Sequence, residues 1–246
     1  MDSGQGMTLA TFVAQTDTVG KAILIVLVAM SMVTWYLIVT KAVQAWMIRS
    51  RTAMFLQSFW SAPSMPAVAL RLEERSPDEP FSRLSHSAIA ASKHHQRHGS
   101  HRLDEAGSAS EFLLRAMRRV IDEETARLES GLTMLASIGS TAPFVGLFGT
   151  VWGVYHALAA IGLSGQGTLD KVAGPVGEAL IMTAAGLAVA IPAVLAYNAL
   201  VRSNRVVLAK LDAFAHDLFA FLTTGSHVRE PVSDTARHPA TVASEA

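Results

Sequence analysis

Long stretches without charged side chains constrain this chain more than any other feature. Residues 22–40, AILIVLVAMSMVTWYLIVT, form a 19-residue uncharged run between Lys21 and Lys41. About 20 apolar residues span a bilayer core of roughly 30 Å, so this run predicts one transmembrane helix. The composition agrees: 16% of the residues are charged, whereas a soluble domain carries about a quarter. We therefore expect a membrane protein.

Two further spans follow from the same reasoning. Residues 130–169 include no charged side chain over 40 residues, and one helix of that length would measure about 60 Å, too long for a single crossing. The turn-forming stretch GLSGQGT divides it, which predicts a second span at 135–161 and a short hairpin at 162–172. A third apolar run predicts a span at 173–201.

Basic residues predict how the spans are oriented. The segment 41–134 carries 13 of the 20 Lys and Arg residues, and the chain after span three carries 5. The positive-inside rule places this loop and the helix expected at 202–224 in the cytoplasm, with the N-terminus, 1–21, and the hairpin in the periplasm. We interpret the first span as retained rather than cleaved as a signal peptide. The tail, 225–246, is expected to be disordered.

Amphipathic patterns adjoin the second and third spans. Between Glu111 and Leu135 apolar residues recur at helical spacing among charges, and a second stripe of Leu, Ala and Phe residues runs from Leu208 to Leu222. These patterns predict an all-α membrane protein with three transmembrane helices, in which spans two and three extend into the cytoplasm as long amphipathic helices. Each stripe needs a partner surface, either the other stripe or a neighbouring subunit.

Glu178 is the one acidic residue within an expected span. A carboxylate at the centre of a span costs about 2.5 to 3.5 kcal/mol, so another interaction must offset its burial. One interpretation is a carboxylate at a helix end that reaches the headgroups, which Pro175 and Gly177 would favour. The other is a proton-binding group that faces a protein interior.

Small residues line both helices beside this glutamate. The second span carries Gly146, Gly149 and Gly153, and the third carries Ala179, Thr183, Gly186 and Ala190. Such faces allow close helix packing, and hydroxyls from Thr141, Thr150 and Thr183 could line a polar path between helices. Plain packing is the alternative. Thr183 lies about 140° from Glu178 around the helix, so a shared path requires neighbouring helices.

Long motifs in these two spans resemble the MotA/TolQ/ExbB proton channel family. They are PFVGLFGTVWG at 143–153 and PVGEALIMTAAGLAVAIPAVLAYN at 175–198. The first span, with VTWY at 33–36 and KAV at 41–43, is more similar to the ExbB branch than to the TolQ branch. The resemblance implies a proton pathway through Glu178, Thr150 and Thr183. The chain departs from the family at Val176–Gly177 and at Met182, whose bulk could alter the lining of a pore.

The resemblance also implies partners. It implies a homo-oligomer, a pentamer, around the single helices of an ExbD-like protein in the bacterial inner membrane, using the proton motive force to drive a TonB-like protein that energises uptake of iron chelates. Two alternatives remain open: a TolQ-like subunit of the Tol-Pal system, and a small solute permease in which Glu178 binds substrate. A permease would usually show repeated halves, which this sequence lacks.

Other functions find little support in the sequence. A net charge of zero argues against nucleic-acid binding, and no phosphate-binding loop or cofactor motif occurs. His94, His95, His98 and His101 invite a metal site, but Gly99 and Ser100 interrupt their helix, so we expect none. His156 lies near the end of span two and is expected at the interface. We therefore expect no enzyme, no metal and no cofactor.

Overall fold

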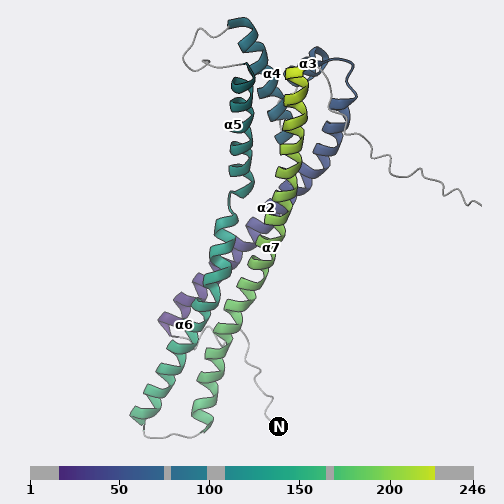
Figure 1. Ribbon diagram of the computed structural model, residues 1–246. Helices are drawn as coiled ribbons and strands as arrows, with labels where there is room; N and C mark the ends of the chain where they lie inside the picture. Colours follow the sequence, from purple (N-terminus) through teal and green to yellow (C-terminus); the bar gives the residue numbers. More distant parts are fainter. Residues whose placement is uncertain (1–16, 75–78, 99–108, 165–168, 225–246) are drawn as a thin grey trace, which may run out of the picture.

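The structure is an elongated assembly of α-helices (Figure 1). This computed structural model describes residues 17–74, 79–98, 109–164 and 169–224, which form no β-strand. The expected all-α fold is confirmed over these residues, and the expected tail, 225–246, lies outside them. The helices are α2 (Thr18–Trp60), α3 (Met65–Glu74), α4 (Pro80–His98), α5 (Ala109–Glu129), α6 (Leu132–Ser164) and α7 (Leu169–Thr224).

Three stretches of helix are long and apolar enough to cross a membrane: Thr18–Trp60, Ala109–Leu163 and Ala179–Thr224. In one half of the molecule α2, α6 and α7 run beside one another (Figure 1). Their shared core consists of apolar side chains such as Leu27, Leu135 and Ala193. Large apolar residues also cover the outside of these helices, as lipid or neighbouring apolar helices require.

The helices are longer than the expected spans. Helix α2 has 43 residues, and α7 has 56 residues, which corresponds to about 84 Å at 1.5 Å per residue. Helix α7 begins at Leu169, nine residues before Glu178, so this glutamate does not lie in the first turn of its helix. Helix α6 continues to Ser164; residues 165–168, within the expected hairpin, lie outside the described part.

The helix expected to continue from Glu111 through span two is divided in two. Gly131 has a φ angle of 80°, a left-handed conformation that glycine adopts at little cost. The last carbonyls of α5 are bound by side chains from other helices. Lys41 of α2 donates to the Arg127 carbonyl oxygen at 3.3 Å, and Asn204 of α7 donates to that of Leu128 at 2.9 Å. Side chains from α2 and α7 therefore stabilise the end of α5.

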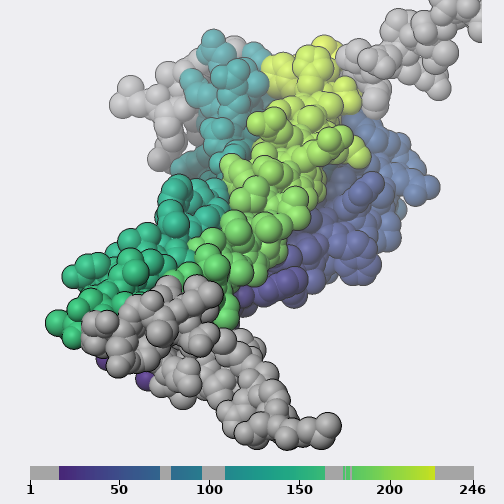
Figure 2. Space-filling view, turned by 90° about the horizontal axis from the view of Figure 1, so that it is seen from below, coloured from purple at the N-terminus to yellow at the C-terminus, as the bar shows by residue number. Residues whose placement is uncertain are grey.

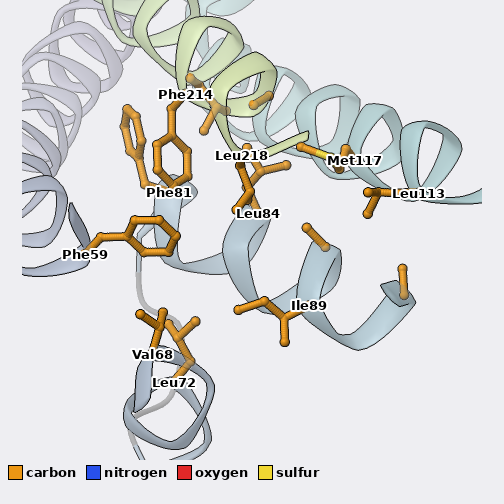
Figure 3. Close-up of a cluster of buried hydrophobic side chains, with 14 of the residues drawn as sticks. Phe59, Val68, Leu72, Phe81, Leu84, Ile89, Leu113, Met117, Phe214 and Leu218 are labelled. Carbon is orange, nitrogen blue, oxygen red and sulfur yellow. The ribbon is translucent and has the colours of Figure 1, made fainter. Parts of the chain in front are cut away.

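A second apolar core lies outside the expected spans, where α3, α4 and α5 surround the ends of α2 and α7 (Figure 1). Figure 3 shows the rings of Phe59, Phe81 and Phe214 together, with Leu84 and Leu218 beside them. The stripe on α7 therefore has its partner surface within the same chain. We call α3, α4 and α5, together with the ends of α2 and α7 that they surround, the outer bundle. Its helices α3 and α4 were not predicted individually from the sequence.

A substitution at Phe214 tests the importance of this packing. Its ring contacts those of Phe59 at 5.1 Å and Phe81 at 5.6 Å. Phe214→Ala should therefore lower the free energy of unfolding of the outer bundle by about 3–5 kcal/mol. The measurement is thermal unfolding of the solubilised chain followed by circular dichroism. Val206→Ala, on an exposed position of the same helix, is the control; equal losses in both variants would contradict the packing argument.

Candidate functional site

Helices α6 and α7 approach each other at the level of their backbones. The Cβ of an alanine at position 146 would lie 2.6 Å from the Met182 carbonyl oxygen, and one at position 186 would lie 2.6 Å from that of Ala142. Distances this short are not tolerated between real atoms, so both positions require glycine. Figure 2 shows the surface of α6 lying directly beside that of α7.

The other small residues extend this contact as an antiparallel ladder. The position of a Cβ on Gly149 lies 2.9 Å from Cβ of Met182, and on Gly153 it lies 3.0 Å from that of Ala179. Further along α7, Ala190 is buried in the same core. The structure thus brings together the glycines of α6 and the small residues of α7.

Thr150 and Thr183 meet across this contact. Their hydroxyl oxygens are 3.3 Å apart, and Thr150, which is 7% exposed, donates to the Leu147 carbonyl oxygen at 2.6 Å. Either hydroxyl can be the donor in this pair, because each carries one proton and accepting lone pairs. The two hydroxyls join α7 to α6 in the segment where both helices are apolar.

Glu178 lies in helix α7, but its side chain lies outside the described residues. Along the helix it precedes Thr183 by five residues, a separation of about 7.5 Å. The structure therefore brings two of the three residues expected in a proton pathway together, and it places the backbone of the third about one and a half turns away on the same helix.

A contact that the sequence analysis missed holds the start of α2 against α6. Asp17 caps α2 by accepting from the Gly20 backbone N–H at 2.8 Å, and it also accepts from the Trp152 indole N–H at 2.6 Å. The hydrogen bond from Trp152 is the main reason that the pKa of Asp17 is lowered. An aspartate directly before an apolar helix is a recognisable capping signal, although its second partner is not.

Two other expectations concern residues near this site. Met182 is 3% exposed and packs against Gly149, so its bulk is accommodated between helices of the same chain. Thr141 is exposed and donates to the Ser137 carbonyl oxygen at 2.7 Å. It therefore does not join Thr150 in the contact between α6 and α7.

The histidines outside this site have structural neighbours. His94 and His95 lie against the ring of Phe112, with centroid distances of 6.4 and 6.0 Å. His156 lies 4.5 Å from the ring of Trp152 and is exposed. Within the part of the chain that the structure describes, no group of three or more His, Cys, Asp or Glu residues could hold a metal ion; the side chain of His98 and all of His101 lie outside that part.

Comparison with known proteins places these features in a family. Residues 77–213 match the MotA/TolQ/ExbB proton channel family. The biopolymer transport protein ExbB of Xanthomonas campestris pv. campestris (strain B100) is 49% identical over 209 residues, which cover 84% of this chain and 83% of that protein. ExbB of Neisseria meningitidis serogroup A is 41% identical over 86% of this chain and 96% of that protein.

A TolQ protein of the same family is also similar to this chain. The Tol-Pal system protein TolQ of Pseudomonas aeruginosa is 32% identical over 220 residues, covering 89% of this chain and 94% of that protein. The chain therefore belongs to the MotA/TolQ/ExbB proton channel family. Together with the three apolar helices, this membership makes it a multi-pass membrane protein, and its similarity to the two ExbB proteins exceeds that to this TolQ protein.

The backbone contact between α6 and α7 gives a sharp prediction. Gly146→Ala forces a methyl group against the Met182 carbonyl oxygen, so we expect a loss of about 1–3 kcal/mol in stability from overpacking. Gly162→Ala is the matched control because a Cβ there meets no atom within 4 Å. The thermal stability of both purified variants decides the matter. A Gly146→Ala protein as stable as the control would contradict the close approach.

Proposed function

We propose that this chain is a proton-channel and motor subunit of the bacterial inner membrane that, with an ExbD-like partner, uses the proton motive force to energise TonB-dependent transport across the outer membrane. The observation that carries the proposal is the hydrogen bond between Thr150 and Thr183, close along α7 to the one acidic residue of the apolar segment, Glu178. Family membership and similarity to ExbB proteins support it.

The three residues would have different tasks. Threonine hydroxyls can donate and accept hydrogen bonds but do not store a proton, whereas a carboxyl group can. Glu178 would therefore load and release the proton, and the Thr183–Thr150 pair would orient water or the carboxyl group beside it. Each hydroxyl can rotate about its C–O bond and exchange the roles of donor and acceptor. The pair could therefore be reset after each proton transfer.

The driving force is large enough for mechanical work. One elementary charge that crosses about 100 mV releases roughly 2.3 kcal/mol, which can shift helices between positions that differ by a few kcal/mol. In this proposal the N-terminus and the hairpin before α7 lie in the periplasm, and the outer bundle lies in the cytoplasm. Several copies of the chain, five by resemblance, would surround the single-span helices of the partner.

A role in the Tol-Pal system is the second candidate. It rests on the 32% identity with a TolQ protein over most of both chains. The residues proposed for proton transfer would serve either system, so they do not distinguish the two. Expression of the chain in a host lacking ExbB, and separately in a host lacking TolQ, distinguishes them: we expect restored growth on iron chelates in the first host and no restored envelope integrity in the second.

The hydroxyl pair can be tested by replacing each threonine with its near-isostere. Thr150→Val and Thr183→Val should each reduce TonB-dependent uptake by about tenfold or more, because proton transfer loses a hydrogen-bonded step, while Thr150→Ser should retain most activity. Thr141→Val is the matched control, since that hydroxyl bonds only within its own helix turn. Uptake of a labelled iron chelate is the readout, and normal uptake in the valine variants would refute the assigned role.

Glu178→Gln tests the proton-storing group directly. The amide keeps the size of the side chain but does not take up or release a proton at neutral pH. The oligomer should therefore assemble normally while uptake is abolished. Assembly is measured by co-purification with the one-span partner, and uptake as above. Normal uptake by a correctly assembled Glu178→Gln complex would exclude the motor function.

A further inference from the structure

A buried carboxyl group lies in the outer bundle, far from the expected spans in the sequence. Glu79 directly precedes α4 and is 6% exposed. Its backbone is fixed: its N–H donates to Ser82 Oγ at 3.3 Å, and the Ser82 hydroxyl donates back to its carbonyl oxygen at 2.9 Å. Pro80 at the first position of the helix adds to this start signal. The side chain is thus held at the junction of α4 with α2.

The two oxygens of this carboxyl group are unequally satisfied. Oε2 accepts a hydrogen bond from the hydroxyl of Thr52 on α2 at 3.1 Å, and Thr52 is itself buried. Oε1 is buried without a hydrogen-bond partner. Burying an ionised carboxylate whose Oε1 lacks a hydrogen bond is costly.

The charged groups around Glu79 come from three helices. Arg51 of α2 and Arg83 of α4 both attract its negative charge. However, Arg83 Nε lies 2.8 Å from Oε1 of Glu124 on α5, and Glu124 is also bound by Arg127 at 3.3 Å. Arg83 is therefore engaged by a second buried carboxylate. From helix α7, the ring of Phe214 packs on Phe81, two residues after Glu79.

Burial outweighs these attractions. Desolvation raises the pKa of Glu79 from 4.5 to about 7, although the hydrogen bond from Thr52, the backbone N–H of Ser82 and the charges of Arg83 and Arg51 oppose the shift. The group therefore changes its charge within the physiological range of pH.

We propose that Glu79 is a second proton-binding site of this chain, in the outer bundle, and that release of its proton loosens the attachment of α4 to α2. The protonated carboxyl group is neutral and fits the buried junction. After deprotonation, the unpartnered Oε1 carries charge, so it draws in water or competes with Glu124 for Arg83, and either event weakens the α2–α4 contact. This inference is independent of the proton pathway at Glu178.

The effect on stability has a definite sign. Because the pKa in the folded chain exceeds the ordinary value of 4.5, the folded state holds this proton after the unfolded state has lost it. The stabilisation is complete below about pH 4.5, falls progressively up to about pH 7 and is then constant. Glu79→Gln should therefore remove a fall in the thermal midpoint across this window, whereas Glu123→Gln, an exposed carboxylate in a loose pair with Arg119, should leave it in place.

The chain has no cysteine, so the α2–α4 distance can be measured with two introduced labels. Met54→Cys on α2 and Ala90→Cys on α4 are both at exposed positions. Spin-labelled chains, diluted with unlabelled chains in lipid nanodiscs, report the distance within one subunit. We expect a narrow distribution at about pH 6 and a broader one at about pH 8 in the otherwise unchanged chain, and a narrow one at both values with Glu79→Gln.

A pair of variants at Thr52 keeps the test decisive if Glu79→Gln fails to fold. The Thr52 hydroxyl favours the ionised carboxylate, so Thr52→Val should move the transition to higher pH, while Thr52→Ser should leave its midpoint close to that of the original chain. A distribution that does not change between the two pH values would overturn the proposal. A pH response that persists in Glu79→Gln, or a midpoint that Thr52→Val does not move, would overturn it equally.

Discussion

The backbone contact of α6 with α7 at Gly146 and Gly186 is the constraint on which the rest of the structure depends. Because no side chain separates the helices there, their backbones approach closely and larger residues cannot replace the glycines. This close approach brings the hydroxyls of Thr150 and Thr183 within hydrogen-bonding distance. A bulkier pair of residues would separate the helices and break this bond, even if both threonines were retained.

Two helices pass through both cores of the molecule. Helix α2 contributes Leu27 to the core between the long helices and Phe59 to the outer bundle, and α7 contributes Met182 and Leu218 in the same way. Both are uninterrupted helices, so a shift at one end displaces side chains at the other. Between α5 and α6, in contrast, the helix is interrupted at Gly131. We expect movement to pass between the cores through α2 and α7.

The sequence predicted features that depend on local pattern. Missing charges located the apolar helices, and the spacing of Gly146 and Gly186 indicated close packing. It did not predict the contact of Asp17 with Trp152, which joins residues 135 positions apart, or the end of α5, whose carbonyls are bound by Lys41 from α2 and by a residue of α7. Such contacts depend on how three helices meet, and no window along the chain contains that information.

Glu79 shows why burial of charge is the hardest property to predict. It lies in a polar segment, where an acidic residue is normally solvated. Glu124 is buried to a similar degree, 3% exposed, yet two arginines contact it at 2.8 and 3.3 Å, whereas Oε1 of Glu79 has no hydrogen-bond partner. The two carboxyl groups thus differ in their partners rather than in their depth. These partners come from α2, α4 and α5, so they are in place only once the bundle has assembled.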